Sequence, residues 1–192
     1  MTVRRVAIIG GGVIGLAIAR ALARDGHVVD VFERDVAGAG ATRAAAGMLA
    51  AGMEAEPGEQ TLHALCRRSQ LLWPDFAAEI ARESGLPVGL RTEGTLQVAL
   101  TQDDAARLRF LADYQHGLGV MLDWLTPAEA RRREPHLGAR LAGALFCAED
   151  HQVDPRFLVP ALRAAVLAAG VRLHEGVTVD ALLTAGGAAS GV

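Results

Sequence analysis

A glycine-rich turn between an apolar strand and a helix constrains this chain more than any other feature. Gly10, Gly12 and Gly15 form a G-x-G-x-x-G pattern, preceded by the apolar run 3–9 and followed by the helical segment 16–24. In such a pattern the first glycine permits a tight turn, the second lets a pyrophosphate approach the backbone, and the third lets the helix pack closely on the strand. The N–H groups at the helix start attract anions. The pattern therefore predicts a dinucleotide-binding βαβ unit.

An acidic residue at the end of the second predicted strand, residues 27–32, supports this prediction. Glu33 is placed to accept hydrogen bonds from both ribose hydroxyls of an adenosine. Arg34 raises the alternative of NADP, because an arginine there can meet a 2′-phosphate, but Glu33 would repel that phosphate. A glycine-rich turn that binds no nucleotide is the other alternative.

A run of small residues beyond the second strand, residues 41–50, favours a flavin over a nicotinamide. Thr42 and the neighbouring backbone amides can bind the pyrophosphate and the ribityl chain, while Ala46 and Gly47 let the main chain lie against an isoalloxazine ring. A nicotinamide dehydrogenase has no need of such a segment there. An alanine-rich helix start is the alternative, since the whole chain is rich in alanine. We interpret the run as an FAD contact.

Composition excludes several other classes of protein. With 51% hydrophobic residues, a net charge of −3 and no lysine, the chain is typical neither of nucleic-acid binders nor of polybasic membrane-surface proteins. Schiff-base and P-loop lysine chemistry are excluded for the same reason. Cys66 and Cys147 lack any spacing that suits a metal, so we expect none. The glycines interrupt an N-terminal apolar run that is too short to cross a bilayer, which predicts a cytoplasmic protein without a membrane span.

The order of elements predicts an α/β fold in two parts. One is a Rossmann-like FAD-binding domain, a parallel sheet with flanking helices, and the other is part of an α+β substrate domain with a mixed or antiparallel sheet. We expect the first part of the FAD-binding domain at residues 1–86, a partial substrate domain at 87–151, and a truncated return to the FAD-binding domain at 152–192.

Local patterns predict further elements. Residues 59–84 read as one long helix that Pro74 should kink or restart. Thr101 and Thr126 are expected to cap helices, the latter within a capping box. Residues 178–183 read as a late strand.

The small-residue run resembles the glycine oxidase branch of the D-amino-acid oxidase family, whose members carry a near-identical T-x-A-A-A-G-M-L segment. Further stretches resemble that branch in the same order, and the resemblance covers essentially all 192 residues. These stretches are 69–73, 93–96, 133–135 and 153–157.

The resemblance implies a set of FAD contacts in addition to the three glycines. They are Val13, Ile14, Glu33, Arg34, Ala41, Thr42, Ala46, Gly47, Met48 and Val179. Val179, on the late strand, would contact the adenine through its backbone amide and carbonyl. Glu54 is a candidate for the mouth of the active site, with plain solvent exposure as the alternative.

The resemblance also implies the reaction, which is oxidation of glycine or a similar small amine or amino acid. Hydride passes to flavin N5, dioxygen reoxidises the flavin to give hydrogen peroxide, and the imine feeds the thiazole ring of thiamine. The flavin does this chemistry, so no catalytic side chain is predicted here. The arginine that pairs with the substrate carboxylate is expected beyond residue 192. We therefore expect a truncated chain that is weakly active or inactive alone, whereas full-length family members tend to form homo-oligomers.

Two alternatives stay open at this stage. One is a D-amino-acid dehydrogenase or sarcosine-oxidase-like flavoenzyme, which differs in electron acceptor or preferred amine. The other is a non-catalytic FAD-binding remnant.

Overall fold

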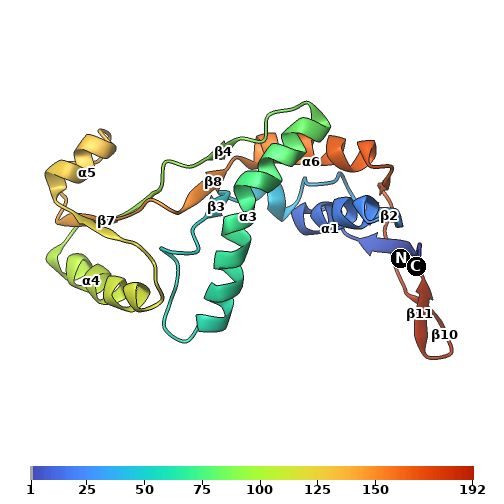
Figure 1. Ribbon diagram of the computed structural model, residues 1–192, viewed down its shortest axis with the longest axis horizontal. Helices are drawn as coiled ribbons and strands as arrows, with labels where there is room; N and C mark the ends of the chain where they lie inside the picture. The colour runs from blue at the N-terminus through green and yellow to red at the C-terminus, as the bar shows by residue number, and fades with distance from the viewer. Residues whose placement is uncertain (1) are drawn as a thin grey trace. The chain divides into compact units, whose positions relative to one another are not determined.

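The structure of the chain is a computed structural model that describes residues 2–192 and divides into two compact units (Figure 1). The first unit combines the chain up to Gly47 with Asp75–Gly89 and Asp154–Val192, and the second combines Met48–Pro74 with Leu90–Val153. The domain boundaries predicted after residues 86 and 151 stay predictions.

A parallel sheet forms the centre of the first unit. Its strands are β1 (Arg5–Ile9), β2 (Val28–Glu33) and β9 (Arg172–Glu175), in the order β1-β2-β9. The middle strand buries Val29 and Val31 almost completely, as expected for a parallel strand covered by helices. This arrangement confirms the predicted α/β class and the βαβ unit.

Two long helices of the first unit supply its apolar packing. Helix α1 (Val13–Arg24) buries Leu16 and Ala19, and helix α6 (Pro155–Ala168) packs against α1 while burying its own apolar face. Asp154 caps α6 by accepting a 2.9 Å hydrogen bond from the Arg156 N–H. The short helix α2 (Ala41–Ala44) lies between β2 and the second unit in the sequence.

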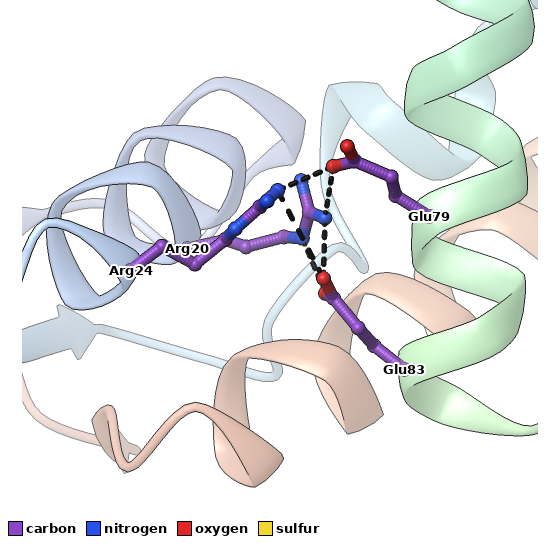
Figure 2. A network of polar contacts seen from close by, with 4 residues as sticks. All are labelled: Arg20, Arg24, Glu79 and Glu83. Atoms are coloured by element: carbon purple, nitrogen blue, oxygen red, sulfur yellow. Dashed lines mark hydrogen bonds and ion pairs between the residues drawn. The ribbon is translucent and has the colours of Figure 1, made fainter.

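The last ten residues of helix α3 (Gln60–Ser84) are joined to α1 by a network of ion pairs (Figure 2). The Arg20 side chain, only 5% exposed, donates to Glu79 at 2.8 Å and to Glu83 at 2.6 Å, and Arg24 also pairs with Glu79. Hydrogen bonds from Arg20 lower the pKa of both glutamates. The two carboxylates thus compensate a cation that burial would otherwise destabilise.

The C-terminal part of the first unit differs from the prediction. Residues 178–182 form no strand, and a hairpin follows instead, made of β10 (Leu183–Ala185) and β11 (Ala188–Gly191) (Figure 1). The hairpin turn contains Gly186 and Gly187, both with positive φ, which is the conformation that a tight hairpin turn requires. The glycine pair therefore fixes the pairing of its immediate neighbours. The predicted strand is wrong because pairing reaches back only to Leu183, opposite Gly191, so residues 178–182 have no strand partner.

The second unit contains two antiparallel sheets. The first joins β3 (Met48–Leu49), β8 (His151–Val153) and β4 (Leu90–Arg91) in the order β3-β8-β4. The second joins β5 (Thr95–Ala99), β7 (Gly143–Cys147) and β6 (Asp123–Leu125) in the order β5-β7-β6. The central strand β7 is buried along its whole length, so it forms the middle of this core.

The helices of the second unit begin where the sequence predicts. Thr101 caps α4 (Gln102–Gly117), and Thr126 caps α5 (Pro127–Arg133), each within a complete capping box. The predicted long helix is also confirmed, because α3 runs through Pro74 as one helix.

Candidate functional site

The glycine-rich turn brings the end of β1 and the start of α1 into close contact. Gly10 has a φ of +100°, and its N–H donates a 2.8 Å bond to the Phe32 carbonyl on β2. A Cβ atom on Gly15 would lie 3.2 Å from the Gly10 carbonyl carbon and closer still to its oxygen, which leaves no room for a side chain. The turn therefore requires glycine at residues 10 and 15, as in a dinucleotide-binding βαβ unit.

Helix α1 begins without a side-chain cap. Its N-cap is Gly12, which offers no acceptor, so the first N–H groups lack the partner that serine or aspartate usually supplies. The Val13 N–H is the exception, since it donates a 3.0 Å bond to the Thr42 hydroxyl from α2. The helix start therefore keeps N–H groups and a partial positive charge available for an anion.

Glu33 is fixed at the end of β2 by two backbone groups. Its Oε2 accepts a 2.7 Å bond from the Gly11 N–H, and its Oε1 accepts a 3.0 Å bond from the Asp35 N–H. A carboxylate oxygen can accept two hydrogen bonds, so each oxygen keeps one acceptor site. Glu33 can thus accept hydrogen bonds from two ribose hydroxyls while it remains held in place.

A pocket of about 530 Å³ lies in the first unit over these groups. It is lined by the ends of β1 and β2, by α2 and by the segment that follows β9. Of the predicted FAD contacts, the structure brings together here Gly10, Gly12, Glu33, Arg34, Ala41, Thr42 and Val179. Val179 lines the pocket from an irregular segment and not from the strand that was predicted for it.

The other predicted contacts lie outside the lining of this pocket. Val13, Ile14 and Gly15 form the first turn of α1, where the Ile14 side chain is 74% exposed. Ala46 and Gly47 follow α2. Gly47, with a φ of +77°, is the last residue of the first chain segment that belongs to this unit. Met48 belongs to the second unit, where it pairs with Gln152 in the β3–β8 ladder.

An ion pair that contacts the loop after β2 was not predicted from the sequence. Glu175, at the end of β9, pairs with Arg163 of α6 and accepts a 2.7 Å bond from the Ala37 N–H. The hydrogen bonds from Arg163 and then Ala37 lower the pKa of Glu175. The pair fixes the loop between Glu33 and Thr42 through Ala37, which lies 126 residues from Arg163 and 138 residues from Glu175 in the sequence, so no local signal marks these contacts.

These observations fit the adenosine diphosphate half of a dinucleotide. The uncapped start of α1 suits the pyrophosphate, the two free acceptor sites of Glu33 suit the ribose, and the glycines allow the close approach of both. No group of three or more histidine, cysteine or acidic side chains within residues 2–192 could hold a metal. In the same described range, no helix combines the length and the apolar character needed to cross a bilayer.

The second unit has its own pocket, of about 500 Å³. Its walls come from β3, the segment after it and the first half of α3, and its lining includes Met48, Glu54, His63 and Trp73. His63 is buried, and its Nε2 has no hydrogen-bond partner. Glu54, predicted at the mouth of an active site, is exposed and borders this pocket.

The fold and the first pocket define a class of protein, one that binds a dinucleotide on a βαβ unit. The family can be stated as well. Residues 5–192 match the family described as FAD dependent oxidoreductase, and this chain belongs to that family. FAD as the cofactor and oxidoreductase as the class of enzyme are thereby confirmed, and so is the resemblance to the glycine oxidase branch.

Three comparisons with known proteins specify this relationship. The chain is 40% identical over 171 residues to the glycine oxidase of Geobacillus kaustophilus, an alignment that covers 88% of this chain and 45% of the relative. It is 36% identical over 189 residues to the bifunctional protein ThiO/ThiG of Trichormus variabilis, and this alignment covers 98% of this chain and 28% of the relative. The crystal structure of the Geobacillus kaustophilus glycine oxidase superposes with a TM-score of 0.84 at 39% identity, covering 91% of this chain and 47% of that one. The chain thus spans less than half the length of these relatives.

Proposed function

We propose that this chain is the FAD-binding part of an oxidase that acts on glycine or a similar small amine or amino acid. The observation that carries the proposal is the pocket formed by Glu33 and the uncapped start of α1, in a chain 40% identical to a protein named glycine oxidase. Its second support is the similarity, 34% identity over 174 residues, to a Rhizobium etli protein named putative thiamine biosynthesis oxidoreductase ThiO, which links the reaction to thiamine biosynthesis.

Each part of the first pocket has a defined role in this proposal. Glu33 holds the adenosine ribose, and the N–H groups at the start of α1 hold the pyrophosphate. Thr42 orders the turn, since its hydroxyl fixes the Val13 N–H. Ala46, Gly47 and Met48 remain the predicted contacts of the isoalloxazine ring. When bound, FAD accepts a hydride from the carbon that bears the substrate nitrogen.

Several finer points belong to the same proposal. They are dioxygen as the electron acceptor, hydrogen peroxide and an imine as products, a cytoplasmic location and homo-oligomeric assembly of the longer family form. The arginine that would bind the substrate carboxylate is not assigned to any residue of this chain, and low activity of the 192 residues alone stays a prediction.

Cofactor binding tests the first part of the proposal. The purified chain should bind FAD more tightly than NAD or NADP, as measured by isothermal titration calorimetry, and should release FAD on denaturation. Binding of NAD without any binding of FAD to the folded chain would contradict the proposal. Replacing Arg34 by glutamine tests the NADP alternative, because loss of the charge that would meet a 2′-phosphate should weaken NADP binding far more than FAD binding.

Turnover tests the second part. Glycine- and sarcosine-dependent oxygen consumption is compared with reduction of an artificial dye, which separates an oxidase from an amino-acid dehydrogenase. The prediction for the 192 residues is little peroxide in the presence of bound FAD. Robust turnover would refute the predicted inactivity and leave the FAD assignment intact.

A further inference from the structure

Buried polar side chains gather around one irregular segment of the second unit. Residues 2–192 contain five buried polar or charged side chains, and three of them, Gln70, Gln115 and Asp150, bind the backbone of residues 49–55. Their exposed fractions are 4%, 1% and 0%. Burial of a polar group is unfavourable unless its bonds are made, so three such groups on one segment indicate a requirement for a defined backbone conformation.

Asp150 binds the segment through its carboxylate. Its Oδ1 accepts a 3.0 Å bond from the Gly52 N–H, and its Oδ2 accepts a 3.0 Å bond from the Met53 N–H. Asp150 also immediately precedes β8, whose residues pair with β3. The ladder therefore fixes Met48 and Leu49, and the carboxylate fixes the backbone three to five residues further on.

Gln70 and Gln115 bind the carbonyl groups of the same segment. The Gln70 amide of α3 donates to the Leu49 carbonyl and to Asp150 Oδ1, both at 2.9 Å. The Gln115 amide of α4 donates to the carbonyls of Met53 and Ala55 at 2.9 and 3.1 Å. The segment has no regular ladder beyond Leu49, and these side chains supply the partners that a ladder would otherwise provide.

Gly52 is tightly enclosed at the centre of this arrangement. A Cβ atom there would lie 2.8 Å from Val120 Cγ1, 3.0 Å from Cys147 Sγ and 3.2 Å from Asp150 Oδ1. The Asp150 carboxylate can therefore reach the Gly52 N–H only because residue 52 has no side chain.

We propose that Asp150, Gln70 and Gln115 are positioning residues that hold residues 49–55 in one conformation for the flavin and the substrate. This inference rests on the proposed function, in which Met48 contacts the isoalloxazine ring. Met48 immediately precedes the segment and Glu54 lies within it, and both residues line the pocket of the second unit. A fixed backbone here presents a prearranged surface to the reacting ring, whereas a mobile one would have to be ordered at each turnover.

The first measurement is independent of flavin. Asp150→Asn keeps the shape of the side chain but replaces one acceptor oxygen by a donor, which leaves an N–H group without its partner. We expect amide hydrogen exchange in residues 49–55 to accelerate about tenfold or more, while exchange in strand β7 stays unchanged. Gln70→Met removes the amide donor to the segment and also the Oε1 acceptor of Arg67. It should produce a smaller acceleration in the same segment and provides a second variant if Asp150→Asn fails to fold. Asp123→Asn, at an exposed aspartate of the same unit, is the matched control.

The second measurement concerns the flavin. With variants held well below their melting temperatures, we expect a changed visible spectrum of bound FAD, while affinity for ADP stays within twofold of the parent chain. A purely structural role would lower the melting temperature and leave the spectrum unchanged, and that result overturns the proposal. Unchanged exchange in residues 49–55 overturns it too, with or without flavin. Failure of the parent chain to bind FAD would instead contradict the proposed function.

Discussion

The close contact between α1 and β1 predicts that replacing a helical glycine by alanine lowers thermal stability at Gly15 and raises it at Gly117. In Gly15→Ala the new methyl group would overlap the Gly10 carbonyl, which is backbone and cannot rotate away. Gly117, the last residue of α4, has open space around the position of its missing Cβ. Alanine is favoured over glycine in a helix by up to about 1 kcal/mol, a gain available at both positions.

The overlap at Gly15 should outweigh this gain. Forcing a methyl group into a filled site costs about 1–3 kcal/mol, and contact with rigid backbone places Gly15→Ala at the upper end of that range. The net loss is then about 2 kcal/mol, which lowers Tm by about 4–8 °C in a chain of this size, whereas Gly117→Ala should raise Tm by about 2–4 °C. Because α1 must withdraw from the turn, FAD affinity of Gly15→Ala should fall at least about tenfold.

Thermal unfolding followed by circular dichroism, together with calorimetric titration of FAD, measures both effects. FAD affinity of Gly117→Ala should equal that of the parent chain, because residue 117 lies in the other unit. If Gly15→Ala melts within 1 °C of Gly117→Ala and binds FAD equally well, the steric argument for the glycine pattern is wrong.

Three further perturbations test the electrostatic part of the first unit. Glu33→Gln should weaken FAD binding about tenfold in titration calorimetry, since a neutral acceptor makes weaker bonds to ribose hydroxyls and to the Gly11 N–H. Asp30 has its pKa lowered to about 2, mainly by hydrogen bonds from Arg172, so its contribution to stability is full above pH 4 and is lost as the pH falls toward 2. Asp30→Asn should therefore flatten the decrease of Tm between pH 4 and pH 2, and an unchanged slope would contradict this. Arg20→Leu should lower Tm more than Arg24→Leu at pH 7, because Arg20 is the buried cation, and part of the loss should recover near pH 4 as the freed glutamates become protonated.

Features encoded by neighbouring residues were predictable from the sequence. The glycine pattern with its flanking apolar runs predicts β1, α1 and β2, because each glycine acts within the turn that it forms. Thr101 and Thr126 predict the starts of α4 and α5 for the same reason, since a capping box spans only four residues.

Features that depend on distant partners were not predictable. The strand expected at residues 178–183 is wrong because the alternation of side chains does not show where pairing ends, and β10 begins only at Leu183, opposite Gly191 of β11. The bond from the Ala37 N–H to Glu175 joins positions 138 residues apart in the sequence, and those from the N–H groups of residues 52 and 53 to Asp150 join positions 98 and 97 residues apart. A single sequence has no signal for such pairs.

Thr42 and Asp150 both accept hydrogen bonds from backbone N–H groups, but only Thr42 was predicted as a site residue from the sequence. Thr42 lies in a run of small residues that the sequence marks clearly, and its hydroxyl bonds to the start of α1, itself marked by glycines. Residues 50–55 lack a regular ladder, and the partners of the segment come from α3, α4 and the residue before β8. An irregular backbone segment inside a core needs acceptors and donors from outside itself, and only the tertiary fold can deliver them. The recognisable run at residues 41–50 therefore predicts the cofactor. The conformation of residues 49–55 depends instead on side chains 21 to 98 residues away in the sequence, which no local propensity can specify.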